Sequence, residues 1–176
     1  MKRKVSAAIF AVISFFMMLI EIPIFQVYPW LKYDPSDIPA LITGFKFGPM
    51  YGLAVILIRN ILFYLYRGDS YGILGFIASL LAGGSFVFIS TYIYYRKKNR
   101  KSAIKGLILS TLVMTVIMAP TNYIMVKYYF KLENFNLFRY ILIAVTPFNI
   151  IKGLFNSFIV LFIYKKIGSF IEQDEG

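Results

Sequence analysis

Long apolar runs separated by short polar segments cover most of the chain. Five runs approach or exceed the roughly 20 helical residues that cross a bilayer: 5–22, 49–66, 71–95, 103–126 and 139–164. A sixth run, residues 36–47, is too short to span alone at a rise of about 1.5 Å per residue. Ser36 or Asp37 is expected to cap it, and Gly48-Pro49 separates it from the next run. The pattern predicts an all-α membrane protein, a six-transmembrane-helix bundle with a short second helix.

The positions of lysine and arginine predict the orientation, because basic residues concentrate on the cytoplasmic side of membrane proteins. Six spans place most of the 19 basic residues on the side of the N-terminus: Lys2, Arg3, Lys4, Lys46, Arg96, Lys97, Lys98, Arg100, Lys101, Lys105, Lys165 and Lys166. Fewer lie on the other side: Lys32, Arg67, Lys127, Lys131 and Arg139. We therefore expect cytoplasmic N- and C-termini and a single integral membrane domain, residues 1–176.

The composition supports a membrane protein and narrows its function. Hydrophobic residues make up 59% of the chain and the mean hydropathy is +0.70, more apolar surface than a soluble domain of 176 residues could bury. The net charge is +11, and the basic residues lie at the ends of the apolar runs, beside the lipid headgroups. We therefore expect no nucleic-acid binding. The chain has no cysteine, no histidine and no Walker A motif. We expect no enzymatic activity, no metal and no catalytic cofactor.

The loop after the first run is unusually rich in rigid and polar residues. Residues 29–41 hold three prolines, two aspartates, a lysine, a tryptophan and a tyrosine. This segment lies on the predicted outer side and could close over a ligand as a lid, with its prolines limiting the entropy lost on ordering. Asp34 and Asp37 are expected to cap the short helix or to pair with Arg59.

A polar stripe lies inside the last predicted span. Asn149, Lys152 and Asn156 share one helical face, and Pro147 can bend the helix one turn earlier. A lysine at this depth costs several kcal/mol unless it is paired or hydrated. The functional interpretation is a ligand-binding stripe. The alternative is a structural lysine that pairs with a carboxylate such as Glu21 or extends toward the membrane surface.

Two more polar residues lie inside predicted spans. Asn122 can donate and accept, as the recognition of a heterocycle requires, but an interhelical hydrogen bond explains it equally well. Arg59 is two turns from the outer end of its span, and we favour a structural pair with Asp69 or Asp37.

Several motifs together resemble the substrate-binding S components of energy-coupling factor (ECF) transporters, most closely the riboflavin-specific members. The small residues Ala7 and Ala11, four positions apart, let another helix approach closely. The other motifs are the basic N-terminus, the loop from Leu31 to Pro39, the segment 44–52 with its Gly-Pro break, and Pro147-Phe148-Asn149-x-x-Lys152-Gly153.

The resemblance implies a binding protein for riboflavin in the prokaryotic cytoplasmic membrane. Flavin mononucleotide (FMN) is a second candidate ligand, because Lys32 or Arg59 could accommodate its single phosphate. The implied partners are a transmembrane coupling subunit (T component) and two ATPase subunits. The implied substrate-binding residues are Leu31, Lys32, Asn122, Asn149 and Lys152, and the coupling subunit would dock on Ala7 and Ala11.

Other functions stay open at this stage. One is an S component for a different vitamin, such as thiamin, folate or biotin. Another is a stand-alone secondary transporter or channel, although no internal repeat or pair of membrane carboxylates supports it. A membrane enzyme is the weakest alternative, because no catalytic constellation is present.

Overall fold

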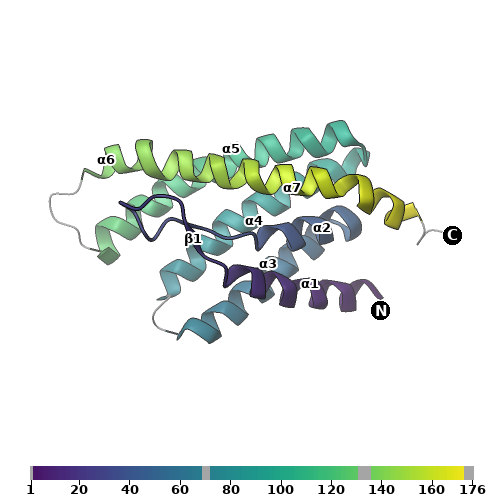
Figure 1. Ribbon diagram of the computed structural model, residues 1–176, viewed down its shortest axis with the longest axis horizontal. Helices are drawn as coiled ribbons and strands as arrows, with labels where there is room; N and C mark the ends of the chain where they lie inside the picture. Colours follow the sequence, from purple (N-terminus) through teal and green to yellow (C-terminus); the bar gives the residue numbers. More distant parts are fainter. Residues whose placement is uncertain (1, 69–71, 131–135, 173–176) are drawn as a thin grey trace.

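The computed structural model is a bundle of helices (Figure 1). It describes residues 2–68, 72–130 and 136–172, with side chains for 3–68, 72–128 and 136–163. The helices are α1 (Lys2–Met18), α2 (Asp37–Phe47), α3 (Pro49–Arg67), α4 (Gly72–Lys97), α5 (Arg100–Ile124), α6 (Leu137–Tyr140) and α7 (Thr146–Glu172). The π-helical turns η2 (Met125–Phe130) and η3 (Ile141–Val145) extend α5 and join α6 to α7. Asp69 and Lys131, and the side chains of Lys2, Lys165 and Lys166, lie outside the described residues.

Each predicted apolar run contains a helix, although α1 ends at Met18, before the end of the predicted run 5–22. Within the described residues, four helical segments are long and apolar enough to cross a membrane: Pro49–Arg67, Gly72–Lys97, Arg100–Tyr128 and Leu137–Ile163. The other two are shorter, with 17 residues in α1 and 11 in α2. The predicted all-helical membrane fold is thus confirmed in its main elements, and the count of six spans stays a prediction.

The segment after α1 differs from the predicted lid. The first helix ends at Met18, and β1 (Ile22–Pro23) pairs antiparallel with β2 (Lys32–Tyr33). Residues 38–41, assigned to the lid from the sequence, lie in α2 and are buried, because their apolar side chains join the core. The loop over the bundle is therefore the segment 19–36, which we call the lid hairpin.

The start of α2 also differs from the prediction. Ser36 occupies the N-cap position, but its side chain makes no capping hydrogen bond. Its hydroxyl instead contacts the Asp34 carboxylate and the Arg59 guanidinium. Asp37, the first residue of α2, is held by Arg59. Charged partners bind these side chains more strongly than the helix end would, since hydrogen bonds to ionised groups are the stronger ones.

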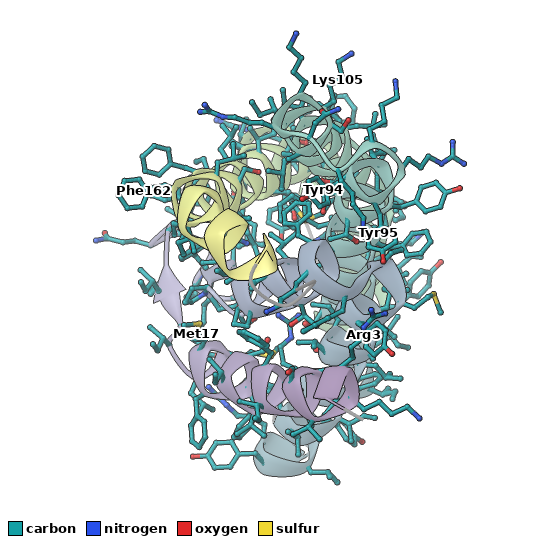
Figure 2. The ribbon with its side chains drawn as sticks, turned by 90° about the vertical axis from the view of Figure 1, so that its right-hand side faces the viewer. Arg3, Met17, Tyr94, Tyr95, Lys105 and Phe162 are labelled. Carbon is teal, nitrogen blue, oxygen red and sulfur yellow. The ribbon has the colours of Figure 1, made fainter. Side chains whose placement is uncertain are left out.

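The bundle has two different ends. Figure 1 places the start of α1, the end of α2, the α4–α5 turn and the end of α7 at one end, and the lid hairpin and α6 toward the other. Figure 2 views the first of these ends and labels Arg3 and Lys105 there. The basic segments at both sides of the α4–α5 turn therefore lie far from the lid hairpin.

Helices α4 and α5 approach closely at Gly106, where an added Cβ would lie 2.6 Å from the carbonyl oxygen of Ser90. A backbone atom cannot rotate away, so Gly106→Ala is expected to push the helices apart and to lower the free energy of unfolding by about 1–3 kcal/mol. Gly84→Ala is the matched control, because its nearest atom is a Leu53 side-chain carbon at 3.7 Å. Thermal unfolding in detergent measures both variants. A similar loss in both would contradict the predicted close contact.

Candidate functional site

A cavity of about 330 Å³ lies beneath the lid hairpin. Its volume is within the range of small-molecule sites, roughly 300–1,000 Å³. Its lining includes every residue predicted to bind substrate: Leu31, Lys32, Asn122, Asn149 and Lys152. These side chains come from the lid hairpin, α5 and α7, so the fold brings together positions that are far apart in the sequence.

The walls of the cavity are mostly apolar. Trp30, Phe63 and Phe148 contribute aromatic rings, and Met118 and Met125 add flexible apolar side chains. The wall on α4 consists of small residues: Gly75, Ala78, Ser79 and Ala82. This wall was not predicted, although Gly75, Ala78 and Ala82, at a spacing of i, i+3 and i+7, share one helical face. Small side chains leave width for a flat ligand.

Asn122 is held in a hydrogen-bonded chain that begins in the lid hairpin. The Trp30 indole nitrogen donates to the Tyr140 hydroxyl at 2.8 Å, and that hydroxyl donates to Asn122 Oδ1 at 3.2 Å. Asn122 Nδ2 donates to the Met118 carbonyl oxygen at 3.0 Å. The interhelical hydrogen bond offered as one interpretation of Asn122 is present, and the same residue also lines the cavity.

Lys152 is paired with the lid hairpin and not with Glu21. Its Nζ lies 2.9 Å from Asp34 Oδ2 and 3.6 Å from Asp37 Oδ2. Burial by itself would raise the pKa of Asp34, but the charges of Lys152 and Arg59 outweigh it and hold that pKa below its usual range. Asp34 is therefore a carboxylate at neutral pH, and it attaches the lid hairpin to α7.

The predicted polar face of α7, Asn149, Lys152 and Asn156, lies toward the interior of the bundle. Asn149, 2% exposed, donates from Nδ2 to the Val145 carbonyl oxygen at 2.8 Å, which fixes its orientation. Asn156 accepts from the Tyr33 hydroxyl at 3.0 Å and donates to Asp37 at 3.2 Å. Burial raises the pKa of Tyr33, so its hydroxyl keeps the proton that it donates.

Arg59 forms the structural pair predicted with Asp37. The two side chains lie 2.8 Å apart and are 2% and 0% exposed. Arg59, Asp37, Asp34 and Lys152 form what we call the inner ionic cluster, which joins α3, α2, the lid hairpin and α7. Two cations face two carboxylates, so the cluster is formally neutral.

A second set of charges lies at the mouth of the cavity. Glu21 Oε2 is 2.6 Å from Lys32 Nζ and 2.8 Å from Arg67 Nη2, and all three residues line the cavity. We call them the rim triad. Glu21 and Arg67 were not predicted to line the site, because no local motif connects the segment after α1 with the end of α3.

Comparison with known proteins identifies the family. The family model "ECF transporter, substrate-specific component" matches residues 2–164. The chain belongs to this family. A solved structure described as the S component of a bacterial ECF transporter matches this S component with a TM-score of 0.84 and 34% identity, over 97% of each chain. As a transporter component, the protein is not an enzyme.

Two relatives of this S component have names that state a substrate. It is 36% identical to the riboflavin transporter RibU of Staphylococcus aureus (strain TCH60), over 98% of this chain and 93% of the relative. It is 29% identical to the riboflavin transporter FmnP of Bacillus subtilis (strain 168), over 98% and 95% of the two chains. The resemblance inferred from the sequence motifs is confirmed.

The two alanines predicted to dock a partner lie on the inner face of α1. Ala7 is 5% and Ala11 0% exposed, and both belong to the hydrophobic core. The outer face of α1 presents larger side chains, Ile9 and Phe16 among them. In this conformation a partner helix cannot reach Ala7 and Ala11 directly. Their docking role stays a prediction. It would require α1 to rotate, or the partner to contact the exposed residues beside them.

Proposed function

We propose that this S component binds riboflavin in the cavity beneath the lid hairpin and mediates its uptake across the cell membrane. The main support for this proposal is that one cavity is lined by all five predicted residues: Leu31, Lys32, Asn122, Asn149 and Lys152. The similarity to RibU and FmnP over nearly the whole length of both relatives supports the choice of riboflavin.

The chemistry of the cavity suits a flat, neutral and hydrogen-bonding ligand. The isoalloxazine ring would pack against the apolar walls, where Leu31 is 6% exposed and Phe148 is 7% exposed. Asn122, Asn149 and Lys152 would bind the polar edges of the ring or the ribityl chain. The inner ionic cluster is already neutral, so a strongly charged group placed beside it would have no counter-charge to meet.

We further infer the topology and the partners. The protein would be one domain of six spans, with the basic end of the bundle and both termini in the cytoplasm and the lid hairpin outside. Its partners would be the transmembrane coupling subunit (T component) and two ATPase subunits, in a prokaryotic cytoplasmic membrane. The segregation of the basic helix ends from the lid end supports this orientation (Figures 1 and 2).

Docking through α1 can be tested on its outer face. Ala8 lies on the exposed side of α1, between the two buried alanines. Ala8→Trp is expected to reduce uptake at least tenfold when the partners are present and to leave riboflavin binding in detergent unchanged, because a bulky ring blocks close helix approach. Val116→Trp, on the exposed face of α5, is the control. Equal uptake by both variants would show that the outer face of α1 is not part of the docking surface.

An uptake experiment separates the proposed function from its alternatives. Cells or proteoliposomes that contain this protein together with the coupling subunit and ATPases should accumulate labelled riboflavin. Omission of the ATPases should abolish uptake, and excess thiamin, folate or biotin should not compete. Uptake without the ATPases would indicate a secondary transporter, and competition by another vitamin would overturn the assignment of riboflavin.

A further inference from the structure

A second cavity lies on the outside of the bundle, between α5 and α7. It is a groove of about 350 Å³, and it shares no lining residue with the cavity beneath the lid hairpin. Both helices belong to segments that are long and apolar enough to cross a membrane, Arg100–Tyr128 and Leu137–Ile163. Its exposed wall residues therefore face the hydrocarbon of the bilayer. We call this cavity the lateral groove.

The lateral groove has a tightly packed floor and apolar walls. At the floor, a Cβ added to Gly153 would lie 2.5 Å from side-chain atoms of Thr111, so the two helices are in close contact. The walls carry exposed apolar side chains, among them Ile108 and Phe158. The polar residues of the lining, Thr111 and Ser157, are buried, and the Thr111 hydroxyl donates to a main-chain carbonyl of its own helix at 2.8 Å. An occupant of the groove therefore meets an almost entirely apolar surface.

The dimensions of the lateral groove fit a single hydrocarbon chain. On α7 the lining runs from Ile150 to Leu161, which is about 16 Å at a rise of about 1.5 Å per residue. One leaflet of the hydrocarbon core is about 15 Å thick, half of the whole core. At this length, a volume of about 350 Å³ gives a mean cross-section of about 20 Å², whereas a helix about 10 Å in diameter needs about 80 Å². The groove is thus too narrow for a transmembrane helix, and it has room for one extended acyl chain.

Two lysines lie at the end of the lateral groove where α5 begins. Lys101 and Lys105 are one helical turn apart, and their spacing places them on the same face of α5 as the lining residues Ile104 and Ile108. Both lysines are exposed, and neither forms an ion pair within the part of the chain that the structure describes. The sequence from residue 70 to residue 130 contains no aspartate or glutamate. An apolar groove between helices that ends in basic side chains suits an anionic lipid.

We propose that the lateral groove binds one acyl chain of an anionic phospholipid, with the phosphate of the headgroup beside Lys101 and Lys105. The phosphate would supply the negative charge that these two lysines lack, and the chain would cover the apolar walls. The lipid is distinguished from the rest of the bilayer by its headgroup selectivity and its slow exchange. The site is separate from the proposed riboflavin site, so either can fail without the other.

Competition between two phospholipids tests the headgroup. The purified full chain in detergent is mixed with equal amounts of phosphatidylglycerol and phosphatidylethanolamine that carry identical acyl chains, and native mass spectrometry counts the lipids that stay bound. One phosphatidylglycerol per chain should be retained at least fivefold more often than phosphatidylethanolamine. Lys101→Gln with Lys105→Gln should reduce this preference to less than twofold. Arg3→Gln with Lys4→Gln is the matched control and should keep the preference, because it removes two exposed cations at the same end of the bundle, on α1 (Figure 2).

A tryptophan placed in the lateral groove tests the position of the acyl chain. Ile108 is exposed and lines the groove, so Ile108→Trp should lower the retention of both lipids at least fivefold by filling part of it. Leu109→Trp is the matched control, because Leu109 is also exposed on α5 and does not line the groove. Its lipid retention should change less than twofold.

Three results would overturn the proposal. The first is equal retention of the two phospholipids by the unmodified chain, or a preference that persists in the variant without Lys101 and Lys105. The second is equal lipid retention in Ile108→Trp and the unmodified chain, which would place the lipid elsewhere. The third is a dimer of the unmodified chain that Ile108→Trp abolishes, since a second copy would then occupy the groove. Thermal unfolding in detergent checks that each variant is folded.

Discussion

Replacing Lys152 with methionine is expected to weaken riboflavin binding at least tenfold, about 1.4 kcal/mol. Methionine keeps much of the apolar stem and removes the charge. The variant loses a cationic donor at the cavity wall, and the Asp34 carboxylate, 2.9 Å from Nζ, is left without that partner. Titration of flavin fluorescence measures the affinity, and Lys105→Met at the far end of the bundle is the matched control (Figure 2).

A double variant separates a binding role for Lys152 from a structural one. Lys152→Met with Asp34→Asn removes both charges of the pair, so most of the stability lost in the single variant should return. The affinity for riboflavin should stay at least tenfold below that of the unmodified protein. Recovery of full affinity in the double variant would mean that Lys152 serves only to neutralise Asp34.

Replacing Arg59 with methionine is expected to give the largest loss of stability, about 3–5 kcal/mol, because Asp37 would remain as a buried carboxylate. Lys152, 3.6 Å from Asp37, compensates in part and favours the lower end of this range. Thermal unfolding of the purified protein in detergent measures the effect.

A double variant tests whether the loss of stability in Arg59→Met comes from the unpaired Asp37 carboxylate. Arg59→Met with Asp37→Asn removes both partners, and its loss of stability should be smaller than that of Arg59→Met alone. If the double variant is the less stable of the two, Arg59 acts through packing or through its contact with Ser36 and not mainly through Asp37.

The sequence predicted the helices and one face of the site because both depend on periodicity. Apolar runs of about 20 residues mark the long helices, and a spacing of three and seven positions places Asn149, Lys152 and Asn156 on one face. Pro147 was also a useful signal. It has no backbone N–H for the carbonyl of Ile143, and the π-helical turn η3 lies at this point.

The partners of the charged residues could not be predicted, because a single sequence does not show which distant positions meet. Lys152 and Asp34 are 118 positions apart, and Glu21 was the carboxylate suggested for Lys152. The two strands of the lid hairpin were not predicted, for another reason. They contain only two residues each, too short for any alternation of apolar and polar positions to appear.

Direct binding of riboflavin to the purified full chain is the measurement that tests the central claim. We expect the protein to purify yellow, with the absorption spectrum of a flavin. After removal of the bound flavin, added riboflavin should lose fluorescence in a saturable titration that ends near one riboflavin per chain. A colourless preparation of folded protein that leaves the fluorescence of added riboflavin unchanged would contradict the account.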